Sequence, residues 1–280
     1  ILAEHAQFPQ PHVHDAFAAL ADTDSITVDP HKLGYLPYGA GAFVCRDHRA
    51  VALLAEQADY VFHGDAPDDY FARHRRLGQV IPEGSKSGAA AAAVYVTHRV
   101  LPLDHLHFGA LPRQTIRAAE AFAAAAHRFA TDIAPLATAT LPFTPDSNLV
   151  CVAINPVGNR DVATANAYVQ RLADELRCDP TQPLQTRQFF GSSTTLRPES
   201  VGQEELARIL DALGLDPASF GVDAGADRVL ILRHTLMNPY LLDSENGISY
   251  IDRYFDHLAA RIRQLHGERA AGAPKPASTL

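Results

Sequence analysis

The spacing of apolar residues along the chain predicts its helices and strands. Residues 110–130 and 248–265 place apolar side chains at helical intervals, and the second stretch does so at Ile248, Ile251, Tyr254, Phe255, Leu258 and Ile262. Four shorter runs, 88–100, 161–177, 203–213 and 48–58, also have helical character. Alternating or short apolar runs predict strands in SITVDPHK (25–32), where Pro30 stops the strand, and at AFVCRD (42–47), 148–154, 187–196 and 228–236. We therefore expect an α/β protein.

Three features refine this picture of the fold. The run RVLILRHTL (228–236) has a continuous apolar centre, which is typical of a strand in a sheet that is buried on both faces. Residues 15–22 predict a short helix with Asp15 as a candidate N-cap, after a polar leader. The small, polar residues 267–280 predict a disordered tail. The part of the chain after residue 145 has the element order of a small α+β domain.

Length and composition exclude some classes of protein. The chain has 280 residues, enough for one large or two small domains, and 47% of them are apolar, as in ordinary globular proteins. Its formal net charge is −8, so it has no excess of basic residues with which to bind nucleic acid or an anionic membrane. No apolar run is long enough to cross a membrane.

The three cysteines and the amino terminus bear on location and completeness. Cys45, Cys151 and Cys178 show no metal-binding or disulfide spacing, which favours a reducing, cytoplasmic compartment. His12 and His14 would point to opposite sides of an extended segment, so we expect no metal site there. The sequence begins with Ile1 and shows no signal peptide, and we expect a fragment, a processed product or the ordered part of a longer protein.

The segment DPHKLGYLPYGAG (29–41) carries the most informative chemistry. A lysine that follows a strand, beside a histidine and a Gly-rich turn, has the setting of a lysine that forms a Schiff base. Only the neutral amine attacks a carbonyl, so such a lysine needs desolvation or nearby positive charge to lower its pKa. The alternative interpretation of His31 and Lys32 is a surface pair without function.

This segment resembles the lysine segment of the pyridoxal-phosphate (PLP) group II amino-acid decarboxylases, in particular the bacterial tyrosine decarboxylase type. The stretches ADYVF (58–62), EGSKSGAAAAAVYVTHRVLPL (83–103) and VLILRHTLMNPYL (229–241) agree in the same order. The resemblance implies PLP fold type I, like that of aspartate aminotransferase. Residues 1–109 would then be part of the PLP-binding large domain, 110–145 a linking helix and 146–266 the small C-terminal domain.

The resemblance also implies roles for individual residues in binding the cofactor. Lys32 matches the lysine that forms the Schiff base with PLP, and His31 matches the residue beside the PLP phosphate. Ser85 matches a loop that reaches the phosphate. Tyr60 opens a mobile loop that carries a proton-donating tyrosine, and Tyr70 is the rival for that role.

Further implications concern the substrate and the assembly. Tyr38, His234 and Thr235 match positions that shape the substrate pocket. The expected reaction is decarboxylation of an L-amino acid, with an aromatic, tyrosine-like substrate favoured. Members of the family are typically homodimers.

The chain departs from the family upstream of Lys32. Only 31 residues precede this lysine, whereas the acid that pairs with the pyridine nitrogen and the residue that stacks on the ring normally lie upstream. Asp15 and Asp24 do not substitute for that acid. The segment between Tyr60 and Glu83 is also longer than in the bacterial tyrosine enzymes.

Three interpretations follow. In the first, an N-terminal half outside this chain completes the decarboxylase. In the second, the chain is an orphan half that acts as a scaffold or interaction module. In the third, it takes part in another PLP reaction, as a lyase or transaminase.

Overall fold

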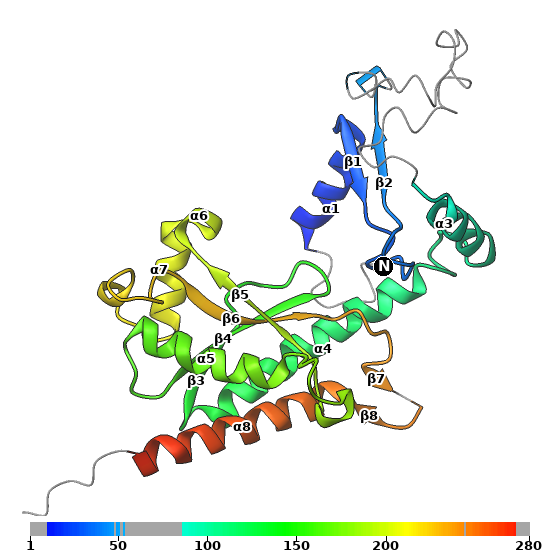
Figure 1. The fold of residues 1–280 in the computed structure, drawn as a ribbon. Helices are drawn as coiled ribbons and strands as arrows, with labels where there is room; N and C mark the ends of the chain where they lie inside the picture. Colours follow the sequence, from blue (N-terminus) through cyan, green and yellow to red (C-terminus); the bar gives the residue numbers. More distant parts are fainter. Residues whose placement is uncertain (1–9, 48, 51–52, 54–85, 244, 273–280) are drawn as a thin grey trace, which may run out of the picture. The chain divides into compact units, whose positions relative to one another are not determined.

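The computed structural model describes residues 10–47, 49–50, 53, 86–243 and 245–272 (Figure 1). The chain divides into two units, an N-terminal unit at Pro11–Ala110 and a C-terminal unit built mainly from Leu111–Leu280. Helices and sheets are mixed in both units, as the sequence predicts for an α/β protein. Each unit is described by itself.

The N-terminal unit begins with helix α1, Pro11–Ala18, and a 3₁₀ turn, Ala19–Asp22. The prediction that Asp15 caps this helix is wrong, because the helix starts four residues earlier at Pro11. A proline suits the first turn of a helix, where its missing N–H has no helical partner. His12 and His14 therefore lie in a helix and not in an extended leader.

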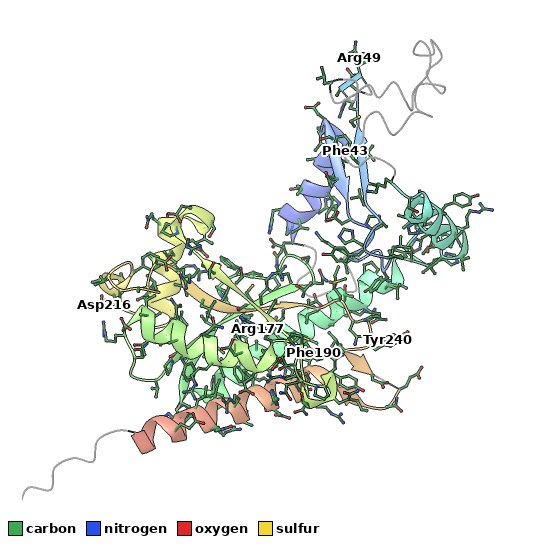
Figure 2. The ribbon with its side chains drawn as sticks, in the orientation of Figure 1. Phe43, Arg49, Arg177, Phe190, Asp216 and Tyr240 are labelled. Carbon is green, nitrogen blue, oxygen red and sulfur yellow. The ribbon has the colours of Figure 1, made fainter. Side chains whose placement is uncertain are left out.

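A hairpin and one long helix form the rest of the described N-terminal unit. Strands β1 (Ser25–Val28) and β2 (Ala42–Cys45) pair antiparallel, with Ser25 opposite Cys45, and helix α3 covers Ala89–Val100. These three elements confirm the predicted ones. Helix α3 contains no buried residue, and Phe43 of β2, labelled in Figure 2, is exposed. Among the described residues of this unit, only Leu36 and Ala40 are buried apolar side chains.

The C-terminal unit is built on a four-stranded antiparallel sheet with the order β3-β4-β6-β5. Its strands are β3 (Ala137–Thr140), β4 (Leu149–Pro156), β5 (Ser192–Leu196) and β6 (Val229–Thr235). Strand β5 is shorter than the predicted 187–196, because a 3₁₀ turn at Leu184–Thr186 and a loop come before it. The short strand β3 was not predicted from the sequence.

Helices pack against the sheet (Figure 1). The apolar side chains between the helices and the sheet form two clusters. The first joins Val150 and Leu232 of the central strands to helices α4 (Ala110–Ile133), α5 (Val162–Leu176) and α8 (Tyr250–Gly272). The second joins Ala153 and Ile231 to helix α7 (Gln203–Ala212), which follows the short helix α6 (Pro198–Val201). Neighbouring residues of one strand enter different clusters, so both faces are buried, as the apolar run 228–236 predicts.

Local interactions set the ends of two helices. The side chain of Asp161 accepts a hydrogen bond from the Thr164 N–H at 2.7 Å and caps α5. Helix α8 begins at Tyr250, two residues after the predicted start, because Ile248–Ser249 form strand β8 against β7 (Leu242–Asp243). The helix continues to Gly272, so residues 267–272 of the predicted tail are helical.

Helix α4 belongs to the interior of the C-terminal unit. Phe122, Phe129 and Ile133 from this helix are buried in the first cluster. Phe122 and Phe129 both pack against the ring of Phe255 from α8, with ring centroids 4.7 and 5.1 Å apart. The segment predicted as a linking helix thus supplies part of the core that supports the sheet.

Candidate functional site

Lys32 lies on a compact turn that follows strand β1. The Lys32 N–H donates to the Asp29 carbonyl at 3.0 Å, and the Tyr35 N–H donates to the Lys32 carbonyl at 3.0 Å. The Leu36 N–H closes the turn on the Pro30 carbonyl at 3.1 Å. This network fixes the backbone on both sides of the lysine.

Two residues of the turn have a backbone that restricts the side chain they can carry. A Cβ on Gly34 would lie 2.2 Å from the Pro30 carbonyl oxygen, so no larger residue fits there without moving the backbone. Tyr35 has a left-handed backbone with φ of 53°, which is uncommon for a residue other than glycine. Its ring lies 6.5 Å from that of Phe108, and burial raises the pKa of its hydroxyl. The shape of the turn therefore depends on these two residues.

The side chain of Lys32 forms an ion pair with Asp29. The distance from Lys32 Nζ to Asp29 Oδ2 is 2.7 Å, and 66% of the lysine side chain is exposed. The hydrogen bond that Lys32 donates to Asp29 raises the pKa of the Lys32 ammonium, and the same bond lowers the pKa of the Asp29 carboxyl. This differs from the predicted setting of desolvation or positive charge, because the turn itself brings a carboxylate to the amine.

His31 points back into the same turn. Its Nδ1 lies 2.7 Å from the Ala40 carbonyl oxygen, which can only accept, so Nδ1 carries a proton. The Nε2 atom is therefore the ring nitrogen that remains to meet a ligand. The ring of Tyr38 lies against the imidazole with centroids 4.7 Å apart, and Tyr38 is 88% exposed. The structure thus brings together three of the predicted site residues, His31, Lys32 and Tyr38.

A pocket of about 670 Å³ occupies the C-terminal unit at the end of strand β6. Five aromatic side chains contribute to its lining: Phe122, Phe189, Phe190, Tyr250 and Tyr254. Phe190 is labelled in Figure 2 and comes from the segment before β5. Aromatic walls with a few polar groups suit a ligand that carries an apolar ring.

The two site residues predicted on β6 both line this pocket, but their surroundings differ. Thr235 is exposed at the last position of the strand, opposite Leu149 of β4. His234 is buried, with Nδ1 3.1 Å from the Val150 carbonyl oxygen and Nε2 2.6 Å from the Tyr254 hydroxyl. Burial lowers the pKa of His234 to about 4 and raises the pKa of Tyr254. The imidazole is thus neutral and already bonded at both nitrogens.

The partners of His234 determine which of its ring nitrogens carries the proton. The Val150 carbonyl can only accept, so Nδ1 carries the imidazole proton and Nε2 accepts from the Tyr254 hydroxyl. The Tyr254 oxygen then retains lone pairs that can accept from a ligand. A ligand hydroxyl or ammonium group is the chemical complement of such an acceptor.

Other predicted and unpredicted residues complete the description. Tyr60, Tyr70 and Ser85 lie outside the described residues, so their roles stay predictions. Asp29 and Tyr254 were not predicted as site residues. Asp29 lies three residues before Lys32, and this spacing is a local signal that could have identified it. The sequence pattern around Tyr254 indicates only a core position of a helix. Within the part of the chain that the structure describes, no three His, Cys, Asp or Glu side chains gather in a way that could hold a metal ion.

Comparison with known proteins relates both the turn around Lys32 and the pocket beside β6 to one family. The family model described as "Tyrosine decarboxylase, C-terminal" matches residues 124–264, which include strand β6 and most of helix α8. This chain belongs to the tyrosine decarboxylase family. The resemblance found from the sequence motifs is therefore confirmed.

Three curated L-tyrosine decarboxylases are similar to most of the chain. The protein of Enterococcus faecium is 32% identical over 253 residues, that of Levilactobacillus brevis 29% over 265, and that of Enterococcus faecalis 29% over 272. These comparisons cover 89%, 94% and 95% of this chain. The comparison with the Enterococcus faecalis protein covers 95% of this chain, and the uncovered remainder is shorter than the 31 residues that precede Lys32. Lys32 therefore lies within the matched region.

The chain spans about two fifths of the length of these tyrosine decarboxylases, 38% to 42% of each. A shorter stretch of 67 residues is 34% identical to an aspartate 1-decarboxylase of Aliivibrio fischeri. Every helix among the described residues is too short or too polar to cross a lipid bilayer.

Proposed function

We propose that this chain is the lysine-bearing part of a PLP-dependent decarboxylase that acts on an aromatic, tyrosine-like L-amino acid. The observation that carries the proposal is the primary amine of Lys32, presented on a fixed turn beside His31 in a member of the tyrosine decarboxylase family. The names of the three curated relatives support the reaction and favour the substrate. The fold of the complete protein would be PLP fold type I.

The residues of the turn fit the chemistry of PLP. A solvent-facing primary amine is the group that bonds to its aldehyde, and Lys32 offers one. His31 has its Nδ1 engaged by Ala40, which leaves Nε2 to donate to a phosphate oxygen when that nitrogen is protonated. Ser85 would add a hydroxyl to the same phosphate. PLP supplies an electron sink for the pair of electrons left behind when the α-carboxylate departs.

The remaining tasks belong to the side chains of the protein. Lys32 must lose a proton before it can act as a nucleophile. The substrate must be held so that the bond to its carboxylate breaks readily and water stays out. Tyr60, or its rival Tyr70, would then return a proton to the α-carbon. Tyr38, His234 and Thr235 would contact the substrate side chain.

The pocket beside β6 supports an aromatic substrate. Its lining is rich in aromatic rings and includes Tyr254, whose hydroxyl donates to His234 and keeps lone pairs that can accept. A tyrosine side chain has an apolar ring and a hydroxyl that can donate, so it matches both features.

We also propose that activity requires a second polypeptide segment. The chain spans about two fifths of the length of its relatives, and the remaining part would supply the acid that pairs with the pyridine nitrogen. The complement would be the N-terminal part of a tyrosine decarboxylase, and the complete enzyme would be a homodimer.

Reduction of the PLP-treated chain with borohydride tests this proposal. We expect an absorbance band of lysine-bound PLP and, after reduction and digestion, a pyridoxyl group on Lys32. The band should be lost in Lys32→Ala and kept in the matched control Lys86→Ala. Failure to modify Lys32 in the PLP-treated protein would overturn the proposal and favour a scaffold.

Complementation tests the reaction itself. Addition of the separately expressed N-terminal part of the Levilactobacillus brevis relative should allow release of CO₂ from L-tyrosine together with the corresponding amine. Formation of a keto acid instead would contradict decarboxylation and favour a transaminase.

A further inference from the structure

Among the residues that the structure describes, Asp29 is the charged partner of the proposed cofactor lysine. Its Oδ2 atom lies 2.7 Å from Lys32 Nζ, and both side chains come from the same short turn. The backbone hydrogen bond from the Lys32 N–H to the Asp29 carbonyl links the same two residues at 3.0 Å. The carboxylate is therefore delivered to the amine by local chain geometry and not by packing of distant elements.

We propose that Asp29 is a positioning residue that holds the Lys32 side chain in place as an ammonium until the cofactor aldehyde arrives. This inference rests on the proposed function of Lys32. Asp29 is not among the residues that bind the cofactor or the substrate in that proposed function. Capture of the aldehyde would then require the pair to separate.

The charged and titratable groups around Lys32 support this assignment. Asp29 is the largest influence on the lysine and raises its pKa through the hydrogen bond, and Tyr38 acts in the same direction. His31 acts on Asp29 by charge and not through a hydrogen bond. The groups that act on Lys32 through charge or hydrogen bonds thus favour its protonated form.

The chemical step can be written explicitly. The Lys32 ammonium gives one proton to Asp29 or to water, and its nitrogen lone pair then attacks the aldehyde carbon. A C=N bond replaces the C=O bond, and the carbonyl oxygen leaves as water. Removal of the carboxylate leaves a larger fraction of Lys32 as the neutral amine at neutral pH, which speeds the attack.

Acylation of the whole chain with acetic anhydride measures this amine directly. The neutral nitrogen forms an amide bond, acetate leaves and a proton passes to water. The chain has three lysines, Lys32, Lys86 and Lys275, so digestion and mass spectrometry follow each one separately. Lys86 serves as the internal reference within each sample.

In Asp29→Asn we expect the rate at Lys32, relative to Lys86, to rise about two- to five-fold near pH 7, as is usual for loss of one exposed ion pair. The gain should shrink as the pH rises past the ordinary lysine pKa near 10.4, because a growing fraction of the lysine is then neutral in both proteins. Asp29→Glu should retain most of the original slow rate. Asp24→Asn, on the same hairpin, should leave it unchanged.

Two results would overturn the inference. One is an unchanged rate in Asp29→Asn. The other is a gain of equal size at every pH, because that indicates better access to Lys32 and no effect on its protonation.

A second arm separates this inference from the proposed function. PLP followed by borohydride should label Lys32 faster in Asp29→Asn than in the unmodified chain at neutral pH. If PLP labels Lys32 equally fast in both, the role of Asp29 is wrong and the proposed function stands. If acylation responds as expected but PLP labels Lys32 in neither protein, the proposed function fails while the effect of Asp29 on the amine stands.

Discussion

The Tyr254 hydroxyl of helix α8 donates to His234 Nε2 of strand β6 at 2.6 Å, and both residues are buried. Twenty residues separate them in the sequence, and Phe122 from helix α4 packs against both rings. The pair links strand β6 to helices α4 and α8, two of the three helices of the first core cluster. It also forms part of the lining of the pocket.

Tyr254→Phe should destabilise the C-terminal unit by about 1 kcal/mol, because it leaves the buried Nε2 of His234 without its donor. Hydrogen exchange of β6 amides in urea would report the loss. Tyr250→Phe is the matched control, since Tyr250 is exposed on the same helix and lines the same pocket. Equal effects of the two substitutions would contradict a specific role for the buried bond.

The stability of the C-terminal unit should fall in acid because of His234. Its pKa in the folded unit is about 4, below the ordinary value near 6.5, so the unfolded chain binds the proton more readily between these two pH values. Stability is therefore complete above about pH 7 and declines by up to about 3 kcal/mol as the pH falls to 4.

Urea unfolding of the C-terminal unit at a series of pH values would measure this decline. His234→Gln should flatten the curve in that window, whereas His127→Gln, at an exposed position of helix α4 in the same unit, should keep it. A curve of the same slope in His234→Gln would show that other groups cause the decline.

Gly34→Ala should loosen the lysine turn. The new Cβ would lie 2.2 Å from the Pro30 carbonyl oxygen, a backbone atom that cannot rotate away, and relief of such overlaps typically costs about 1–3 kcal/mol. The Leu36 amide, which donates to that carbonyl, should exchange faster with solvent. Gly41→Ala is the control, because nothing lies within 4 Å of its Cβ position. Unchanged protection of Leu36 would refute the prediction.

Asn166→Ala should destabilise the C-terminal unit by about 3 kcal/mol or more. The Asn166 amide donates to the carbonyls of Gly225 and Arg228 at 2.6 and 2.7 Å and accepts from the Leu230 N–H at 2.7 Å. Truncation leaves three partly buried backbone groups without this partner. Thermal unfolding should show a clear drop relative to Gln170→Ala, whose bond to Asp174 is exposed. A loss as small as that of the control would contradict the structural role of Asn166.

Much of this protein is determined by the sequence itself. The helices α3, α4, α5 and α7 and the strands β1, β2, β4 and β6 follow from apolar spacing and from turn residues, which act over a few neighbouring positions. The motif around Lys32 and the stretches after it were sufficient to indicate the family. The composition was sufficient to predict a protein with a substantial apolar core.

Only the tertiary structure decided which polar groups meet. Sequence spacing places Tyr254 on an apolar helix face and His234 in an apolar strand, but the bond between them exists because α8 packs across β6. The bonds of Asn166 to a loop some 60 residues away have the same origin. Periodicity reports which side of an element is buried, whereas the partner of each buried donor depends on how separate elements pack, and that information is not local to any segment of the chain.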